Sequence, residues 1–243
     1  VYLIHGQEKF KGQQILTLEE ALKQKQVVVE ETSNVNELRV KNLSGSIVFF
    51  QSGDIVRGGK QDRAVQYDLL LAPKQGFTAM PVFCVEHGRW QQRGSEGAGS
   101  FGVSDNQLAG KELKLAAKKS GDQSAVWQGV SSYQSKMASK LGSSVCAEAS
   151  PSSLELTMEH TKVKSATNEH LRNLSKVTDN RADVIGYAFA INGKINSADV
   201  YASNDLFKKL WPKLLKSSAA EAVADQEKGK TSTAPSSSDV LKF

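Results

Sequence analysis

The densest group of chemically versatile side chains lies in Gly53–Arg63, which holds two carboxylates, three cations, a carboxamide and three glycines. The pair Gly58-Gly59 lets the backbone approach a ligand closely and can turn its N–H groups outward. Lys60 and Arg63 could then hold a phosphate or a carboxylate. The alternative is a plain hairpin turn with solvated charges. The candidate ligand-binding residues of this segment are Gly58, Gly59, Lys60, Gln61 and Arg63.

A second group lies at the end of an apolar run, in Cys84–Trp90. Glu86 and His87 are neighbours that could act as a general acid/base pair, which makes them the candidate catalytic residues. The indole of Trp90 could stack on a ligand or hold a cation. In the alternative interpretation Glu86 pairs with Arg89, and His87 is merely exposed. The candidate ligand-binding residues here are Glu86, Arg89 and Trp90, together with Gln123 at the start of a later helix.

Several familiar chemistries lack their sequence signatures. The chain has no Gly-x-x-x-x-Gly-Lys-Ser/Thr phosphate loop and no Gly-x-Ser-x-Gly nucleophile elbow. It has no Cys-x-x-Cys pair, and its four histidines are far apart, so neither a metal site nor another cofactor is expected. Cys84 and Cys146 could form one disulfide or be two unrelated apolar residues.

Composition indicates an ordinary globular protein that can bury a core, with 39% hydrophobic, 23% charged and 7% aromatic residues. The formal net charge is +5, but the basic residues are scattered and not interleaved with aromatic ones, so nucleic acid is not the expected partner. No apolar run is long enough to span a membrane. A start at Val1 is compatible with signal-peptide removal, proteolysis or deliberate trimming, and we favour an extracytoplasmic location over a cytoplasmic one.

Local patterns predict a β-rich N-terminal half. Thr17 and Glu20 have capping-box spacing, which predicts a short helix to about Gln24. Runs rich in β-branched and aromatic residues follow with turn residues between them and no helix, which favours a sandwich-like antiparallel sheet. The expected strands are Val27–Val29, Glu37–Asn42, Ile47–Val56, Ala64–Leu71 and Phe77–Glu86.

The C-terminal half reads differently. The Gly- and Ser-rich segment Gln91–Gly110 predicts a long loop. Apolar residues at helical spacing predict a helix capped by Asp122, a weaker helical region over Ser152–Lys176, and a last helix capped by Ser203 or Asn204. Pro212 should kink or restart that last helix. Asn192-Gly193 between apolar runs predicts a hairpin.

The prediction is therefore an α+β fold, with a sandwich-like antiparallel sheet in the N-terminal half and helices and a hairpin in the C-terminal half. One domain should span residues 1–225, with a β-rich core over about 26–90 and a helical and hairpin part over about 120–222. Residues 226–243 are rich in Ser, Thr and Lys and predict a low-complexity tail that could reach a protein partner.

Read together, these residues resemble a family of bacterial domains associated with ADP-ribosylglycohydrolases and rhodanese-phosphatases. The resemblance reaches to about residue 222 and is most specific in the two central motifs, G-x-x-x-x-GGKQ-D/N-R and PV-x-C-V-E-x-GRW. The segments that carry it are Leu16–Leu22, Asn36–Asn42, Gly53–Arg63, Pro81–Trp90, Gln123–Trp127 and Gly186–Leu215.

The resemblance implies proteins that handle NAD-derived nucleotides or ADP-ribose. We therefore expect a domain that binds a phosphorylated or ADP-ribose-like ligand, with Lys60 and Arg63 on the pyrophosphate, Trp90 on the base and Glu86 on a ribose hydroxyl. Two alternatives remain open. One is a hydrolase that uses Glu86 and His87, and the other is a secreted interaction or assembly protein without catalysis.

Overall fold

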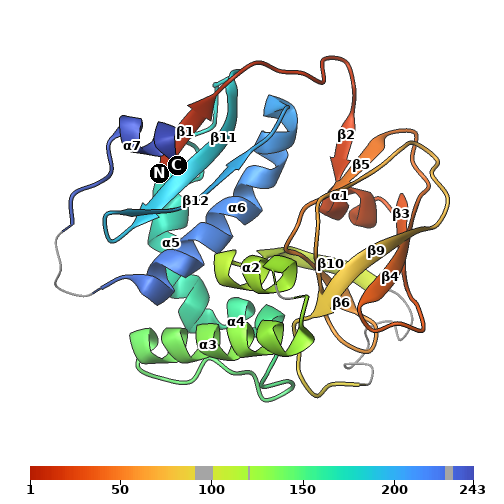
Figure 1. Ribbon diagram of the computed structural model, residues 1–243, viewed down its shortest axis with the longest axis horizontal. Coiled ribbons are helices and arrows are strands. Elements are labelled where there is room, and N and C mark those ends of the chain that lie inside the picture. Colours follow the sequence, from red (N-terminus) through yellow and green to blue (C-terminus); the bar gives the residue numbers. More distant parts are fainter. Residues whose placement is uncertain (91–100, 120, 228–231) are drawn as a thin grey trace.

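The computed structural model describes residues 1–90, 101–119, 121–227 and 232–243 and shows strands and helices in comparable measure (Figure 1). The strands are β1 (Tyr2–His5), β2 (Ile15–Thr17), β3 (Val27–Glu31), β4 (Glu37–Asn42), β5 (Ile47–Phe50), β6 (Asp54–Gly58), β7 (Arg63–Val65), β8 (Leu69–Leu71), β9 (Thr78–Cys84), β10 (Phe101–Leu108), β11 (Val184–Ile191) and β12 (Lys194–Val200). The helices are α1 (Leu18–Lys23), α2 (Lys111–Lys119), α3 (Gln123–Leu141), α4 (Leu154–Glu159), α5 (Thr161–Leu174), α6 (Asn204–Asp225) and α7 (Ser237–Lys242).

The largest sheet curls until its two edges approach each other. Its strand order is β10-β6-β7-β9-β4-β3, and every neighbouring pair is antiparallel. Phe101 of β10 packs in the same apolar cluster as Val27 and Val29 of β3, so the two edge strands share one core. One of the two three-stranded sheets, β2-β5-β8, packs against that core too. The α+β class is confirmed, whereas the description as a sandwich is not.

Local sequence signals set several elements of this half. Glu20 N–H donates to Thr17 Oγ1 (3.2 Å) and Thr17 N–H donates to Glu20 Oε2 (2.9 Å), which is the predicted capping box of α1. Strands β3 and β4 lie where the sequence places them. The local hydrogen bonds of a cap depend on three or four residues only, so they can be predicted from spacing alone.

Two strand predictions were too long. The expected Ile47–Val56 strand is broken at Gly53, where φ is +89°, and the chain turns from β5 into β6 of another sheet. Gln51 N–H donates to the Asp54 carboxylate (2.8 Å) across this turn. The Ala64–Leu71 run divides in the same way, into β7 and β8. Apolar residues flank both turns, Phe50 with Ile55 and Val65 with Leu69, so each pair of strands resembles one long strand in the sequence.

The loop prediction for Gln91–Gly110 was wrong over its second part. Residues 101–108 form β10, which pairs antiparallel with β6 from Phe101 opposite Gly58 to Leu108 opposite Asp54. Residues 91–100 lie outside the described part of the chain. Strand β10 gains its hydrogen bonds from a partner more than forty residues away, and its own sequence lacks the alternation that marks a strand.

The C-terminal half confirms the hairpin and the last helix. Asn192 (φ +51°) and Gly193 (φ +75°) turn β11 into β12, and β1 adds to the free edge of β11. Helix α6 begins after its cap Ser203 and runs through Pro212 without interruption, so the predicted restart was wrong. Pro212 is exposed, so the carbonyl that loses its partner there can be hydrated.

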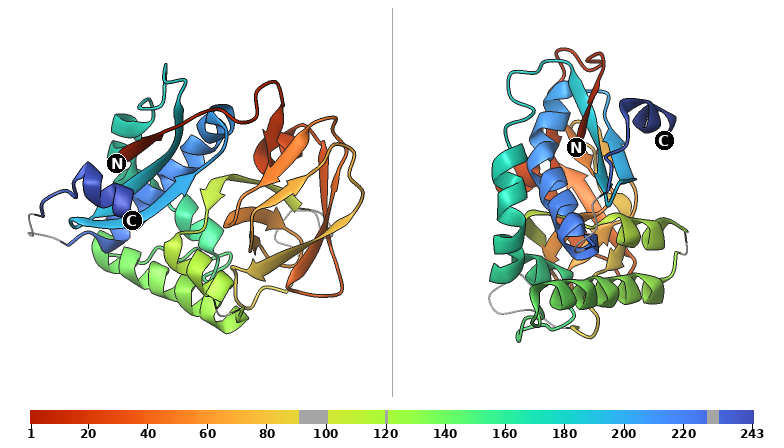
Figure 2. Two further views of the ribbon diagram at one scale, coloured as in Figure 1. Left: turned by 45° about the horizontal axis from the view of Figure 1, so that its top comes forward. Right: turned by 90° about the vertical axis from the view of Figure 1, so that its left-hand side faces the viewer.

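Helix α6 is the central element of this half, lying between α5 and the sheet β1-β11-β12 (Figure 2). Its apolar face places Phe207, Leu210 and Trp211 against that sheet. The buried ammonium of Lys213, on the same helix, pairs with the buried carboxylate of Asp54 at the start of β6. This ion pair links α6 to the curled sheet. None of the helices in the described residues is long and apolar enough to cross a membrane.

Candidate functional site

The structure brings the two predicted segments together at one end of the curled sheet. Asp62 N–H donates to Glu86 Oε2 (3.2 Å), and Gln61 Nε2 donates to the carbonyl oxygen of Glu86 (3.0 Å). Arg63 is the β-ladder partner of Cys84. Residues 25 positions apart are thus adjacent because β7 and β9 are neighbours.

Arg89 is the link between the two segments. Its Nε lies 2.7 Å from Glu86 Oε2 and its Nη2 lies 3.3 Å from Asp62 Oδ1, while Nη1 donates to the carbonyl of Gly59 (3.3 Å). The Arg89 side chain is 7% exposed and both carboxylates are fully buried. A buried charge needs a partner, and loss of one member of such a pair leaves the other uncompensated. Arg89, Asp62 and Glu86 therefore stabilise one another.

Both glycines of the turn after β6 have a positive φ. Gly58 (φ +127°) and Gly59 (φ +56°) lie in the region that favours glycine, and a Cβ at Gly59 would lie 2.5 Å from Glu31 Oε1. The loop amides are already occupied, because Gly58 N–H donates to Asp62 Oδ1 (3.1 Å) and Lys60 N–H donates to Glu31 Oε1 (3.1 Å). Carboxylates of the protein itself fill the positions expected for a phosphate.

Arg63 and Gln61 point into the protein. The Arg63 guanidinium, 1% exposed, donates to the carbonyls of Gln61 (2.7 Å) and Val35 (3.1 Å) and lies 3.7 Å from Glu31 Oε2. Gln61 is fully buried and accepts a hydrogen bond from the Cys84 thiol. Burial raises the pKa of that thiol to about 11, so Cys84 stays protonated at neutral pH. These side chains hold the turn in place.

Gln123 is also a structural link in this arrangement. Its Oε1 accepts from Cys84 N–H (2.9 Å) and its Nε2 donates to the Cys84 carbonyl (2.8 Å), as a neighbouring strand would do. This pair of bonds fixes the first turn of α3 at the end of β9. The predicted site residues that face solvent at this end are Lys60, His87 and Trp90, the last with 54% exposure.

A groove lies beside His87, between the end of β9 and the first turns of α3. The imidazole meets the indole of Trp127 edge to face, with 4.4 Å between ring centroids and 75° between their planes. The groove has a volume of about 470 Å³. Its other polar lining residues are neutral, namely Ser124, Gln128, Ser131, Gln134 and Ser152. The buried Trp127 Nε1–H has no acceptor among the described residues.

Near the Arg89–Asp62–Glu86 network lies a buried carboxyl group that gave no local signal in the sequence. Glu155, near the start of α4, is fully buried, and Ser104 Oγ donates to its Oε2 (2.7 Å). Burial is the main cause that raises the pKa of Glu155 to about 8, and the nearby charges of Asp62 and Glu159 add to it. Its Oε1 has no hydrogen-bond partner within the described part of the chain. Glu155 is therefore a neutral acid at pH 7.

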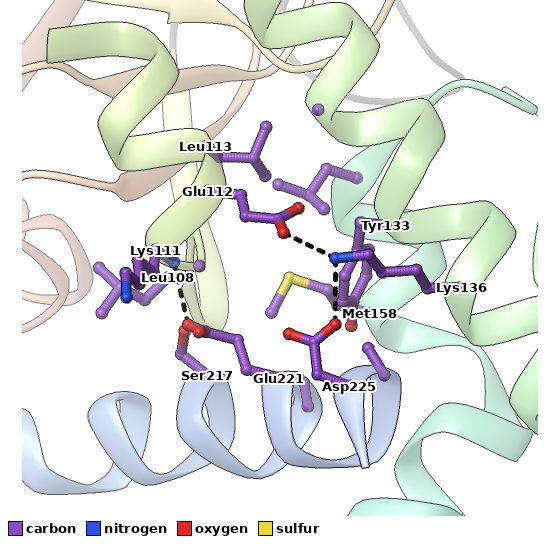
Figure 3. A pocket seen from close by; sticks show the side chains of 15 residues that line it. Leu108, Lys111, Glu112, Leu113, Tyr133, Lys136, Met158, Ser217, Glu221 and Asp225 are labelled. Atoms are coloured by element: carbon purple, nitrogen blue, oxygen red, sulfur yellow. Dashed lines mark hydrogen bonds and ion pairs between the residues drawn. The ribbon is translucent and has the colours of Figure 1, made fainter. Parts of the chain in front are cut away.

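A separate small cavity lies where α2, α3 and α6 meet, and it contains none of the predicted site residues (Figure 3). Lys136 Nζ bridges Glu112 (2.7 Å) and Asp225 (3.0 Å) across its mouth, and Glu221 accepts from Lys111 N–H (3.0 Å). Its volume of about 40 Å³ has room for one or a few water molecules and not for a nucleotide. We assign it a packing role.

Metal and thiol chemistry find little support in the part of the chain that the structure describes. Those residues include no group of three or more His, Cys, Asp or Glu side chains arranged to hold a metal ion. Cys84 and Cys146 are both free cysteines, one buried and one exposed. The disulfide left open by the sequence is thus not formed in this structure.

Comparison with protein-family models identifies the family of this chain. No curated protein and no solved structure matches the chain. The family model described as the ARG and Rhodanese-Phosphatase-superfamily-associated Protein domain matches residues 1–243. This agrees with the resemblance carried by Gly53–Arg63 and Pro81–Trp90, the two segments that meet at the end of the sheet. The chain belongs to the ARG and Rhodanese-Phosphatase-superfamily-associated Protein domain family.

Proposed function

We propose that the protein is a binding domain for an ADP-ribose-like ligand, held at the end of the curled sheet where β9 meets α3. The observation that supports this most is the groove beside His87 and Trp127, in which His87 directly follows Glu86, the partner of Arg89. The family association with ADP-ribosylglycohydrolases is consistent with such a ligand. A rigid, internally paired network next to a polar groove is the arrangement that a preorganised binding site requires.

The groove chemistry suits the sugar part of the ligand. Hydroxyl and carboxamide groups from Ser124, Gln128 and Ser131 can exchange hydrogen bonds with ribose hydroxyls, and Trp127 offers an apolar ring and an unmet N–H donor. Among the described residues, no lysine or arginine lines the groove. We therefore place the charged pyrophosphate toward Lys60, an exposed cation at the same end of the sheet, and the base on the exposed ring of Trp90.

This proposal assigns different roles to the predicted site residues. Lys60, His87 and Trp90 face solvent and would contact the ligand. The other predicted residues would not contact the ligand but would hold the contacting residues in place through their hydrogen bonds and ion pairs. They are Gly58, Gly59, Gln61, Arg63, Glu86, Arg89 and Gln123.

Binding without catalysis is the better supported alternative. A general base must reach the proton that it removes. The Glu86 carboxylate is fully buried against Arg89 and Asp62 N–H, which argues against its use as a base beside His87. The hydrolase alternative would require the Glu86–Arg89 pair to open first.

One observation favours the alternative of an interaction protein. Leu241 of α7 (88% exposed) and Phe243, which follows this helix (66% exposed), are two large apolar side chains that face solvent. Exposed apolar groups of this kind are common at protein contacts. The double variant Leu241→Ser, Phe243→Ser should lose self-association or partner capture under this alternative. Unchanged sedimentation and capture would argue against a docking tail.

The test of the main proposal is calorimetric titration with ADP-ribose, followed by Trp127→Ala and Lys60→Ala. We expect saturable one-to-one binding by the wild type and about tenfold weaker binding, or about 1.4 kcal/mol, in each variant. Phe77→Ala is the control, because Phe77 lies before the opposite end of β9. Absence of heat and of thermal stabilisation at millimolar ADP-ribose and NAD would refute the ligand class.

A further inference from the structure

A third cavity lies where β5, β8, β12, α2 and α6 meet. Its volume is about 340 Å³, within the range typical of small-molecule sites. It shares no lining residue with the His87 groove. Its lining includes Phe10, Phe49, Gln51, Asp68, Asp199 and Tyr201.

Gln51, in the wall of the cavity, carries a hydrogen-bond acceptor that no described residue satisfies. Gln51 is 3% exposed, and its Nε2 donates to the hydroxyl oxygen of Tyr201 (2.7 Å). Its Oε1 accepts no hydrogen bond from any described residue. A buried polar atom without a partner costs about 1–3 kcal/mol, so a donor supplied by a ligand would recover that free energy.

A donor lies beside this acceptor. The Tyr201 hydroxyl oxygen is used as an acceptor by Gln51, and its own proton goes to no acceptor among the described residues. Burial raises the pKa of Tyr201 well above its usual value, so the hydroxyl keeps that proton at neutral pH. Gln51 and Tyr201 together present an acceptor next to a donor.

The walls around this pair favour a flat ring. Phe49 and Tyr201 meet at 87° with 6.2 Å between ring centroids, and Phe10 lines the same cavity. Aromatic rings pack well against other rings, face to edge or offset. A planar heterocycle that carries an N–H donor beside an acceptor would match both the walls and the polar pair.

The charges of the cavity favour a neutral ligand with hydroxyl groups. Lys114 and Lys118 line it together with Asp68 and Asp199, so the formal charges cancel. Carboxylates accept hydrogen bonds from the vicinal hydroxyls of a ribose, and with the charges balanced a phosphate group gains no net attraction. We propose that this cavity binds a nucleoside, with the base edge on Gln51 and Tyr201 and the ribose hydroxyls toward Asp68 and Asp199.

Calorimetric titration with adenosine tests the proposal, with Tyr201→Phe as the first variant. This change keeps the ring and removes the hydroxyl, so we expect adenosine to bind the wild type and to bind the variant at least tenfold more weakly. N6,N6-dimethyladenosine lacks the exocyclic donors and should bind the wild type at least tenfold more weakly than adenosine. AMP should not bind more tightly than adenosine. Tyr67→Phe, at an exposed tyrosine outside the cavity, should bind as the wild type does.

Other outcomes would overturn the inference. Adenosine that fails to bind the wild type at millimolar concentration excludes a nucleoside site. Circular dichroism shows whether Tyr201→Phe is folded. If the folded variant binds adenosine as tightly as the wild type, Gln51 and Tyr201 do not recognise the base. If Tyr201→Phe does not fold, Asp199→Asn replaces it, and unchanged adenosine affinity in that variant contradicts the ribose assignment. Trp127→Ala should leave adenosine binding intact, and its loss there alone would assign adenosine to the groove instead.

Discussion

Replacement of Glu155 by glutamine should remove a pH dependence from the stability of the fold. In the folded state burial, aided by Asp62 and Glu159 and opposed by the Ser104 hydroxyl and Arg57, raises the pKa of Glu155 to about 8 from an ordinary 4.5. The unfolded chain therefore releases this proton near pH 4.5, while the native protein keeps it to about pH 8. Between these values the native state binds more protons, so its stability falls as the pH rises.

The size of the effect follows from the same two values. A difference of one pH unit in proton affinity is worth 1.4 kcal/mol, so the interval from 4.5 to about 8 corresponds to a loss of about 5 kcal/mol of unfolding free energy. Glu155→Gln keeps an amide oxygen for the Ser104 hydroxyl and cannot ionise. We expect the variant to lack this part of the slope and to be more stable than the wild type at pH 8, by about 3–5 kcal/mol.

Urea unfolding at a series of pH values between 4.5 and 8.5 measures this difference. Exposed Glu148→Gln is the matched control, because it makes the same chemical change on the surface. Subtraction of the variant curve from the wild-type curve removes groups that titrate in both proteins, such as Glu19, whose pKa burial raises to about 6. Parallel curves for the wild type and Glu155→Gln across this range would refute the reasoning.

Three further changes test the packing described above. Lys213→Met leaves the carboxylate of Asp54 buried without its partner and should cost about 3–5 kcal/mol in urea unfolding, a loss that the added change Asp54→Asn should largely reverse. A thiol reagent should modify exposed Cys146 in the native protein and reach buried Cys84 only after unfolding, so two rapidly modified thiols in native protein would contradict the buried position of Cys84. Gly59→Ala combines a positive φ with a contact at 2.5 Å and should lower the thermal midpoint by several degrees, whereas an unchanged midpoint would mean that the turn can relax.

Elements whose signals are local could be predicted from the sequence. The capping box of α1, the Asn192-Gly193 turn and the helix after Asp122 each depend on residues a few positions apart. Strand β10 could not be predicted, because its pairing partner β6 is distant in sequence and its own residues show no alternation. The turn at Gly53 was missed because apolar residues continue on both sides of it.

The candidate site, too, could be predicted only in part. Motif spacing was enough to select Gly58–Arg63 and Glu86–Trp90, and the pairing of β7 with β9 brings them together. Sequence alone could not tell that Arg63 and Glu86 turn inward, because the burial of a charge depends on partners contributed by other strands. Glu155 and Trp127 were missed as site residues for the same reason, since each acquires its role from a neighbour across the fold.

The pairing of β1 with β11 has a consequence for the order in which the chain can fold. During synthesis the strands from β2 to β10 leave the ribosome before β11 and can pair with one another, whereas Tyr2–His5 must wait for Val184–Ile191. Contacts of such long range form late, since the intervening chain has to be ordered first. A ribosome-bound chain stalled before β11 would therefore leave Tyr2–His5 without its strand partner, and that segment is one of those a chaperone would meet.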